Sequence, residues 1–275
     1  MRCVSCGRKL PPSRRPFPNP CPRCLRAAGK LPPLGAPDPP GIRTPRAGPL
    51  AVLTPFEGKS WALDRWLGAL RVAALPAQTQ LLWLCNSDDD AFYQRLEAAS
   101  HTMPWPVTLW QDPHKETGGP VKDWTVAYLW RELRKRTPSE TQRVLTLEDD
   151  VLLMPGTVAA LFALPAEHGS NSTVVAAPVP SRIGGQSRDG VWVYGKGYGD
   201  HTVAPRTGAT DRVDWCTFGC TLFPRGLFDR IPLIADLNPG PYCSYDHYAC
   251  EYVRGRGGQI IAVWEARVGH MVHPQ

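Results

Sequence analysis

The chain shows a regular succession of strand-length and helix-length segments from Leu50 onward. Short apolar runs bounded by turn-forming or acidic residues occupy Leu50–Thr54, Leu81–Cys85, Val107–Trp110, Val144–Leu147, Val174–Ala177 and Gln259–Trp264. Segments with apolar residues at helical spacing occupy Trp61–Leu75, Ala91–Ala99, Lys122–Arg136, Pro155–Ala163 and Ala249–Gly255. Strands that alternate with helices of this length predict an α/β fold with a mostly parallel sheet covered on both faces.

Polar and acidic residues follow the strands of this predicted sheet. The cluster Asn86–Asp90 comes directly after the second strand, and Glu148-Asp149-Asp150 comes directly after the fourth. In open α/β sheets the ligand binds at the carboxyl ends of the strands. The pattern therefore places a candidate site at this edge of the sheet.

Residues 181–211 interrupt the alternation of strands and helices. Glycine is frequent there, and aromatic and charged residues are interspersed. A loop of this length inside a compact domain is usually functional or disordered. Two interpretations stay open, a disordered surface insertion and a lid that orders over a donor or acceptor.

The N-terminal part differs in composition from the rest of the chain. Residues 29–49 are dominated by Pro and Gly and contain almost nothing to bury, which predicts a semi-extended linker. We therefore expect a cysteine module at residues 1–28, a linker at 29–49 and a main domain at 50–275. A chain of 275 residues, 43% of them hydrophobic, suits one main domain with an appendage.

Two CxxC pairs mark the module at residues 1–28. Cys3 and Cys6 form one pair, and Cys21 and Cys24 form the other. Each pair can form a tight turn, and four thiolates suit tetrahedral Zn²⁺. A segment with so few apolar residues could not fold unaided, so metal binding would supply the folding free energy. The alternative is two disulfides or unpaired thiols.

Positive charge is concentrated around these two pairs. The basic residues of this region are Arg2, Arg8, Lys9, Arg14, Arg15, Arg23, Arg26 and Lys30. Such a cluster predicts a contact with nucleic acid, although a solvated basic tail or a protein-docking module fits it equally well. The net charge of +6 for the whole chain permits an anionic partner without demanding one.

The sequence gives no sign of a membrane partner. Its longest apolar runs are well below the ~18 residues that a membrane span needs. Residues 1–30 lack the apolar core of a signal peptide. We therefore expect a cytoplasmic protein, in the host cytoplasm if it is viral, whose cysteines are mostly reduced.

The segment Glu148-Asp149-Asp150 is a candidate metal site on residue chemistry alone. Carboxylates at a strand end can hold a divalent cation through hard oxygen ligands. Such a cation would neutralise a pyrophosphate leaving group. The alternative is an exposed acidic turn.

Further motifs follow in order downstream, at Asp214–Arg225, Tyr245–Tyr248 and Gly269-His270. Together with the strand-end clusters, this order resembles the GT-A glycosyltransferases, especially the family-2-like group, over about residues 50–272. The resemblance implies a GT-A fold, which is a Rossmann-like mixed, mostly parallel sheet. It also implies a nucleotide-sugar donor, with a UDP-sugar as the first choice.

The resemblance assigns contacts with this donor. The nucleoside would lie against the residues at the end of the first strand, Thr54, Pro55, Phe56 and Glu57. Asp88 would lie near uracil or ribose, and Asp149 would join the donor-binding residues. Lys122 stands where the family usually carries an Arg-Asn pair, and it would contact the donor as well.

The resemblance also assigns the metal ligands and the base. Glu148-Asp149-Asp150 matches the DxD motif, with Glu in place of the first Asp. Asp150, helped by Glu148 and His270, would bind Mn²⁺ or Mg²⁺. Asp246 matches the base of inverting members and would deprotonate the acceptor hydroxyl as it attacks the anomeric carbon. This displacement implies inversion, and a retaining reaction stays open.

Three functions remain at this stage. The first is a glycosyltransferase that acts on a hydroxymethylated pyrimidine base in DNA, of the kind found in phage genomes. The zinc module and its basic residues favour this reading, and a base would have to leave the duplex to react. The second is a cytosolic glycosyltransferase with a saccharide, lipid or protein acceptor. The third is a zinc-dependent nucleic-acid-binding protein with an inactive GT-A domain.

Overall fold

A computed structural model gives the structure of the main domain. It describes residues 49–112, 122–164, 171–180, 191–194, 201–203, 206–234 and 244–272, and it leaves the side chains of 122–124, 191–194 and 201–203 undescribed. The predicted zinc ligands Cys3, Cys6, Cys21 and Cys24 lie outside the described residues. The same holds for the predicted linker, apart from its last residue.

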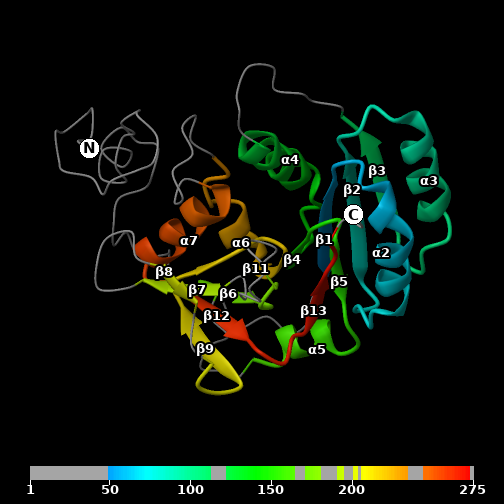
Figure 1. The fold of residues 1–275 in the computed structure, drawn as a ribbon. Coiled ribbons are helices and arrows are strands. Elements are labelled where there is room, and N and C mark those ends of the chain that lie inside the picture. Colours follow the sequence, from blue (N-terminus) through cyan, green and yellow to red (C-terminus); the bar gives the residue numbers. More distant parts are fainter. Residues whose placement is uncertain are drawn as a thin grey trace, which may run out of the picture.

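An eight-stranded mixed sheet forms the centre of the domain (Figure 1). Its strands in spatial order are β3 (Val107–Gln111), β2 (Thr79–Cys85), β1 (Leu50–Phe56), β4 (Arg143–Leu147), β11 (Cys220–Pro224), β6 (Thr173–Ala176), β12 (Gln259–Val263) and β9 (Thr210–Val213). The four strands from β3 to β4 are parallel. Strand β11 runs antiparallel to both of its neighbours, and β12 is parallel to β6 but antiparallel to β9. The predicted α/β class is confirmed.

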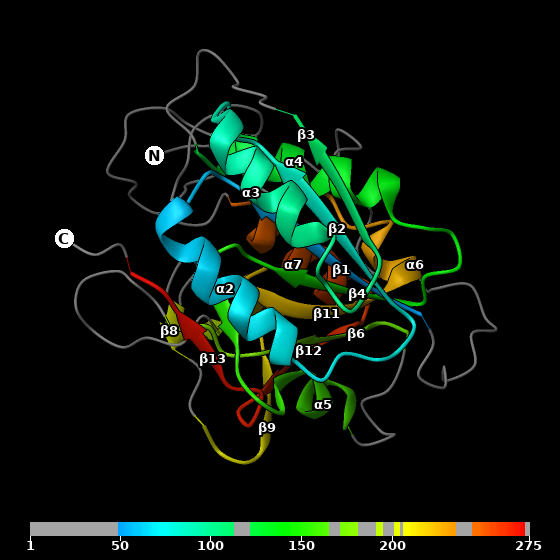
Figure 2. The same cartoon turned by 90° about the vertical axis from the view of Figure 1, so that its right-hand side faces the viewer.

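Helices cover both faces of this sheet (Figure 2). Helices α2 (Ser60–Val72), α3 (Asp90–Ser100) and α5 (Thr157–Phe162) pack on one face. Helices α4 (Lys122–Arg136), α6 (Arg225–Phe228) and α7 (Tyr245–Gly255) pack on the other. No described helix is both long enough and apolar enough to cross a bilayer.

Strand β1 shows why the sheet is buried on both sides. All seven of its residues are buried. Leu50 and Val52 belong to the core under α2 and α3, whereas Ala51 and Leu53 belong to the core under α4 and α7. Successive side chains of a strand point to opposite faces, so an unbroken apolar run fits a sheet with two covered faces.

Two small sheets complete the described structure. Strand β13 (Val268–His270) pairs antiparallel with β5 (Val151–Leu153), and His270 lies opposite Val151. Strands β10 (Trp215–Cys216), β7 (Val191–Tyr194) and β8 (His201–Val203) form the other small sheet. The β5–β13 pair brings His270 beside the residues that follow β4.

The structure corrects the prediction of one long loop at residues 181–211. The described parts of this segment contain β7, β8 and the start of β9, and β9 is an edge strand of the main sheet. The segment is therefore partly built into two sheets. Helix α7 also begins earlier than expected, at Tyr245 and not at Ala249.

Candidate active site

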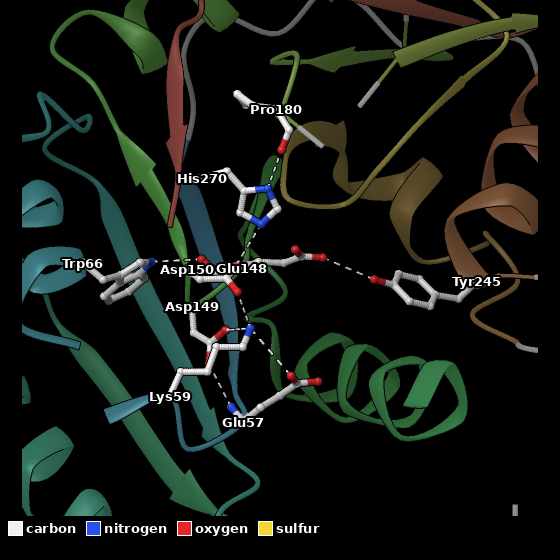
Figure 3. Close-up of polar contacts among 9 residues, drawn as sticks. All are labelled: Glu57, Lys59, Trp66, Glu148, Asp149, Asp150, Pro180, Tyr245 and His270. Carbon is white, nitrogen blue, oxygen red and sulfur yellow. Dashed lines mark hydrogen bonds and ion pairs between the residues drawn. The ribbon is translucent and has the colours of Figure 1, made fainter. Parts of the chain in front are cut away.

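The turn after β1 brings one lysine to the carboxyl edge of the sheet. Gly58 adopts a φ of +83°, and a Cβ atom there would lie 2.9 Å from the Oγ of Ser87. Glycine tolerates both the left-handed backbone and the close approach of the loop after β2. Lys59 follows immediately, and its side chain points to the acidic residues that follow β4 (Figure 3).

The main chain after β4 is fixed by contacts at Glu148. The Glu148 N–H donates to the carbonyl of Gly219 at 3.1 Å, and the Glu148 carbonyl accepts from the Nε1 of Trp66 at 3.0 Å. The Val151 N–H donates to the same carbonyl at 3.1 Å. These bonds hold the acidic segment between strand β11 and helix α2, so its side chains project from a rigid support.

Glu148, Asp150 and His270 form the candidate metal-binding cluster. One ligand atom of each residue lies within 4.8 Å of the others. Asp150 is fully buried, and His270 reaches it because β13 pairs with β5 and the Met271 N–H donates to the Asp150 carbonyl at 2.9 Å. Two carboxylates and one imidazole are a donor set that suits Mn²⁺, and the carboxylates alone suit Mg²⁺.

The imidazole of His270 is oriented by Pro180. Its Nδ1 lies 2.5 Å from the Pro180 carbonyl oxygen, and its Nε2 lies 3.5 Å from Asp150 Oδ1 (Figure 3). A carbonyl oxygen can only accept, so Nδ1 carries the proton and donates. In the neutral imidazole Nε2 then keeps its lone pair, which is the state that a metal ligand needs.

Lys59 is an internal cation of the acidic cluster. Its Nζ lies 2.5 Å from Asp149 Oδ1, 2.6 Å from Asp150 Oδ2 and 3.6 Å from Glu57 Oε2. Asp149 Oδ2 accepts from the Glu57 N–H at 2.9 Å. Both oxygens of Asp149 are therefore bonded within the protein, whereas Asp150 faces Lys59 on one side and His270 on the other.

Burial and mutual repulsion perturb the acids of the cluster. Burial, reinforced by the charge of Asp150, raises the pKa of Glu148 to about 7. Burial also raises the pKa of Asp149 to about 6, although Lys59 opposes this shift. For Lys59, burial alone would lower the pKa, but the charges of Asp149 and Asp150 outweigh it and raise the pKa above its usual value. A further cation would favour the ionised form of Glu148.

The N-terminus of α7 faces the same cluster. The Tyr245 hydroxyl donates to Glu148 Oε1 at 3.4 Å. Asp246, the predicted base, is buried, and its Oδ1 accepts from the His247 N–H at 2.8 Å and from the Ser244 hydroxyl. Asp246 is therefore the next residue after Tyr245, which contacts the acidic cluster directly. The hydrogen bonds that Asp246 accepts also hold the first turn of α7.

The other predicted donor contacts are more dispersed. Thr54, Pro55 and Phe56 are buried, and Phe56 packs edge-on against Trp66 and Trp83 within the core. Glu57 is half-buried beside Lys59. Asp88 is exposed in the loop after β2, and the side chain of Lys122 lies outside the described residues.

Four residues support the cluster without a predicted role, and they are Lys59, Trp66, Pro180 and Tyr245. The only available signal for Lys59 was the segment Glu57-Gly58-Lys59, where a basic residue follows a strand end across a glycine. Trp66 reads as an ordinary core residue at helical spacing. Pro180 acts through its backbone, which leaves no side-chain signal.

No protein-family model and no curated protein sequence matches this chain. The fold is similar to that of S. aureus TarS 1–349, with a TM-score of 0.52 and 12% identity, over 81% of this chain and 60% of that chain. TarS 1–349 in complex with UDP-GlcNAc gives a TM-score of 0.52 and 13% identity, over 82% and 59%. The mannosyltransferase PcManGT from Pyrobaculum calidifontis, in complex with GDP-Man and Mn²⁺, gives a TM-score of 0.56 and 14% identity, over 91% and 63%.

This chain thus corresponds to less than two thirds of the length of each of these proteins. At these low sequence identities, the structural similarity shows the fold alone. That fold is the α/β arrangement of the GT-A-like glycosyltransferases, with the carboxylates and histidine of the candidate cluster at the carboxyl edge of its parallel strands.

Proposed function

We propose that the protein is a metal-dependent glycosyltransferase that moves a sugar from a nucleotide-sugar to an acceptor hydroxyl. The observation that carries this proposal is the convergence of Glu148, Asp150 and His270 at the carboxyl edge of a GT-A-like sheet. The complexes of similar fold with UDP-GlcNAc and with GDP-Man and Mn²⁺ support it. We favour a UDP-sugar as the donor.

The residues of the cluster have distinct tasks in this reaction. Asp150, Glu148 and His270 would hold Mn²⁺ or Mg²⁺, which supplies positive charge next to the diphosphate leaving group. Pro180 fixes the tautomer of His270. Asp149 acts inside the protein, because its oxygens bind Lys59 and the Glu57 N–H.

Asp246 is the residue that we propose as the base. It would take the proton from the acceptor hydroxyl while that oxygen attacks the anomeric carbon, and the bond to the diphosphate breaks with inversion. Its place at the start of α7 supports this role, because the adjacent Tyr245 reaches Glu148. The hydrogen bonds from Ser244 and His247 keep the carboxylate in one orientation.

For the acceptor, we propose a hydroxymethylated pyrimidine base in DNA. The support comes from residues 1–28, where four cysteines with zinc-ligand spacing stand among Arg and Lys residues. Phosphate contacts by these residues would bring DNA to the catalytic domain.

The test is transfer by the full chain. The protein with Mn²⁺ receives UDP-sugars and GDP-sugars in turn, together with hydroxymethylated DNA, unmodified DNA or a saccharide acceptor. We expect nucleoside mass spectrometry to detect the sugar on the modified base alone. Transfer to the saccharide would replace the proposed acceptor. Zinc-dependent DNA binding without release of UDP or GDP from any donor would favour a binding protein with an inactive domain.

A further inference from the structure

The two oxygens of Asp150 have different neighbours. Oδ2 lies 2.6 Å from the Nζ of Lys59, and Oδ1 lies 3.5 Å from the Nε2 of His270. The lysine and the metal-binding cluster therefore lie on opposite sides of one carboxylate (Figure 3). A carboxylate held by one oxygen can present the other in a fixed direction.

Lys59 is itself held from the side away from the cluster. Its Nζ contacts Asp149 at 2.5 Å and Glu57 at 3.6 Å, and Asp149 is in turn anchored by the Glu57 N–H. The lysine side chain is only 18% exposed, and the turn at Gly58 fixes its starting point. An ammonium group has three N–H donors, and three carboxylates surround this one.

The contact with Lys59 restrains the orientation of Asp150. It is fully buried, and Glu148 and Asp149 add negative charge beside it. A carboxylate that loses a charged partner at one oxygen can rotate toward another donor. Such a rotation would move the oxygen that faces His270.

We propose that Lys59 is a positioning residue for metal binding, which holds Asp150 through Oδ2 and thereby directs Oδ1 to the position shared with Glu148 and His270. The inference rests on the proposed metal-dependent function. Lys59 lies in the turn between β1 and α2, outside the DxD-like segment, so this role is additional to those of the motif residues.

Charge balance is the competing explanation, because Lys59 also neutralises part of the cluster. Two variants separate positioning from charge balance. They are the single variant Lys59→Met and the double variant Lys59→Met/Asp149→Asn. The double variant removes one positive and one negative charge, so the net charge of the cluster is unchanged, yet Asp150 loses its contact with Lys59. Removing both members of the 2.5 Å contact also leaves no unpaired charge at Asp149, so this variant is expected to fold.

The measurement is Mn²⁺ binding to the full-length protein without donor, followed by the loss of the free Mn²⁺ signal in electron paramagnetic resonance. The matched control is Lys135→Met, because Lys135 pairs with Glu132 at 2.5 Å on the surface of α4 and is 68% exposed. Thermal melting without metal checks that each variant is folded.

We expect both Lys59 variants to bind Mn²⁺ about tenfold or more weakly, as is typical for lost outer-shell partners of metal ligands. Lys135→Met should bind as the wild type does. In turnover, the Mn²⁺ concentration for half-maximal activity should rise in the Lys59 variants while KM for the donor at saturating Mn²⁺ changes little. A merely structural defect would change both values.

Normal Mn²⁺ affinity in the folded double variant would overturn the positioning role and leave charge balance as the explanation. Normal affinity in Lys59→Met would remove any role for this residue. If the wild type bound no Mn²⁺, or if Asp150→Ala bound it normally, the proposed metal site would fail first, and the inference with it.

Discussion

His270 donates through Nδ1 to the carbonyl oxygen of Pro180 at 2.5 Å, so that its Nε2 faces Asp150. The bond joins the last described strand to a residue 90 positions earlier in the chain. It makes one nitrogen structural and leaves the other for a ligand. The two roles can be tested separately.

We predict that His270→Asn and His270→Gln differ in metal affinity. The Asn amide can replace the bond to Pro180 but has no atom near the position of Nε2. The Gln side chain is longer and can bring its amide oxygen near that position. Mn²⁺ binding should therefore be weaker in His270→Asn than in His270→Gln, as measured by titration calorimetry. Equal and undiminished affinities in both variants would exclude His270 as a ligand.

We predict that Asp150→Ala abolishes sugar transfer. Asp150 is the buried member of the cluster, and its loss leaves Glu148 and His270 without their common neighbour. Release of the nucleoside diphosphate is the measurement, with and without EDTA. Asp64→Ala is the control, because Asp64 is 86% exposed and pairs with Arg95 on the surface. Turnover by Asp150→Ala that EDTA does not affect would show that the ligand is misassigned.

The position of the acidic cluster could be predicted from the sequence because strand ends are local signals. The apolar run Val144–Leu147 stops at Glu148, and parallel strands carry their ends to one edge of the sheet. Helix α4 was predicted with the bounds that the structure has, because its apolar residues recur at helical spacing.

Other features depend on contacts that no local pattern records. Helix α7 was predicted too short because Tyr245 to Cys250 are all buried, so no alternation of apolar and polar residues marks its first turn. Strand β11 ends in Pro224 and runs antiparallel to both of its neighbours, and no strand was predicted at these residues. The contact of Lys59 with Asp150 joins residues 91 positions apart. The local sequence of the turn at Lys59 does not determine the direction of the lysine side chain.

We predict that Gly58→Ala destabilises the protein. The alanine would have to adopt a φ near +83°, which costs about 1–2 kcal/mol, and its Cβ would press against the Ser87 Oγ. The free energy of unfolding in urea is the measurement. Gly68→Ala is the control, since Gly68 lies in α2 with no atom near the added methyl group, and it should stabilise by about 0.5–1 kcal/mol. A Gly58→Ala variant as stable as the wild type would contradict the strained turn.

We predict that Asp246→Asn loses transfer activity and still binds the donor. The Asn carbonyl oxygen can accept from Ser244 and His247 as the carboxylate does, so α7 keeps its first turn. The amide cannot take a proton, and the loss of a general base costs roughly 10²–10⁴ in rate. The comparison is kcat against donor affinity measured by calorimetry. A kcat close to that of the wild type would remove Asp246 from the mechanism.

The last prediction concerns residues 1–30, which carry Cys3, Cys6, Cys21, Cys24 and the basic residues around them. If this segment recruits DNA, its phosphate contacts make binding salt-dependent, with a slope of about −0.9 in log K against log salt for each contact. We expect the full chain to contain about one zinc per molecule by elemental analysis, as four thiolate ligands require.

Deletion of residues 1–30 should weaken DNA binding, reduce its salt dependence and raise KM for DNA, because the phosphate contacts are lost. Donor affinity and transfer to a free hydroxymethylated nucleoside should not change, because the described cluster at Glu148, Asp150 and His270 lies outside the deleted segment. Anisotropy with labelled DNA at two salt concentrations measures DNA binding, and nucleoside mass spectrometry measures sugar transfer.

A further variant, with the four cysteines changed to Ser, keeps the positive charge while removing the zinc site. It therefore separates the effect of zinc-dependent folding of the module from the effect of its charge. If the full chain showed no salt-sensitive affinity for DNA and modified no DNA, the segment would have no role in choosing the acceptor, and a saccharide or protein acceptor would replace DNA.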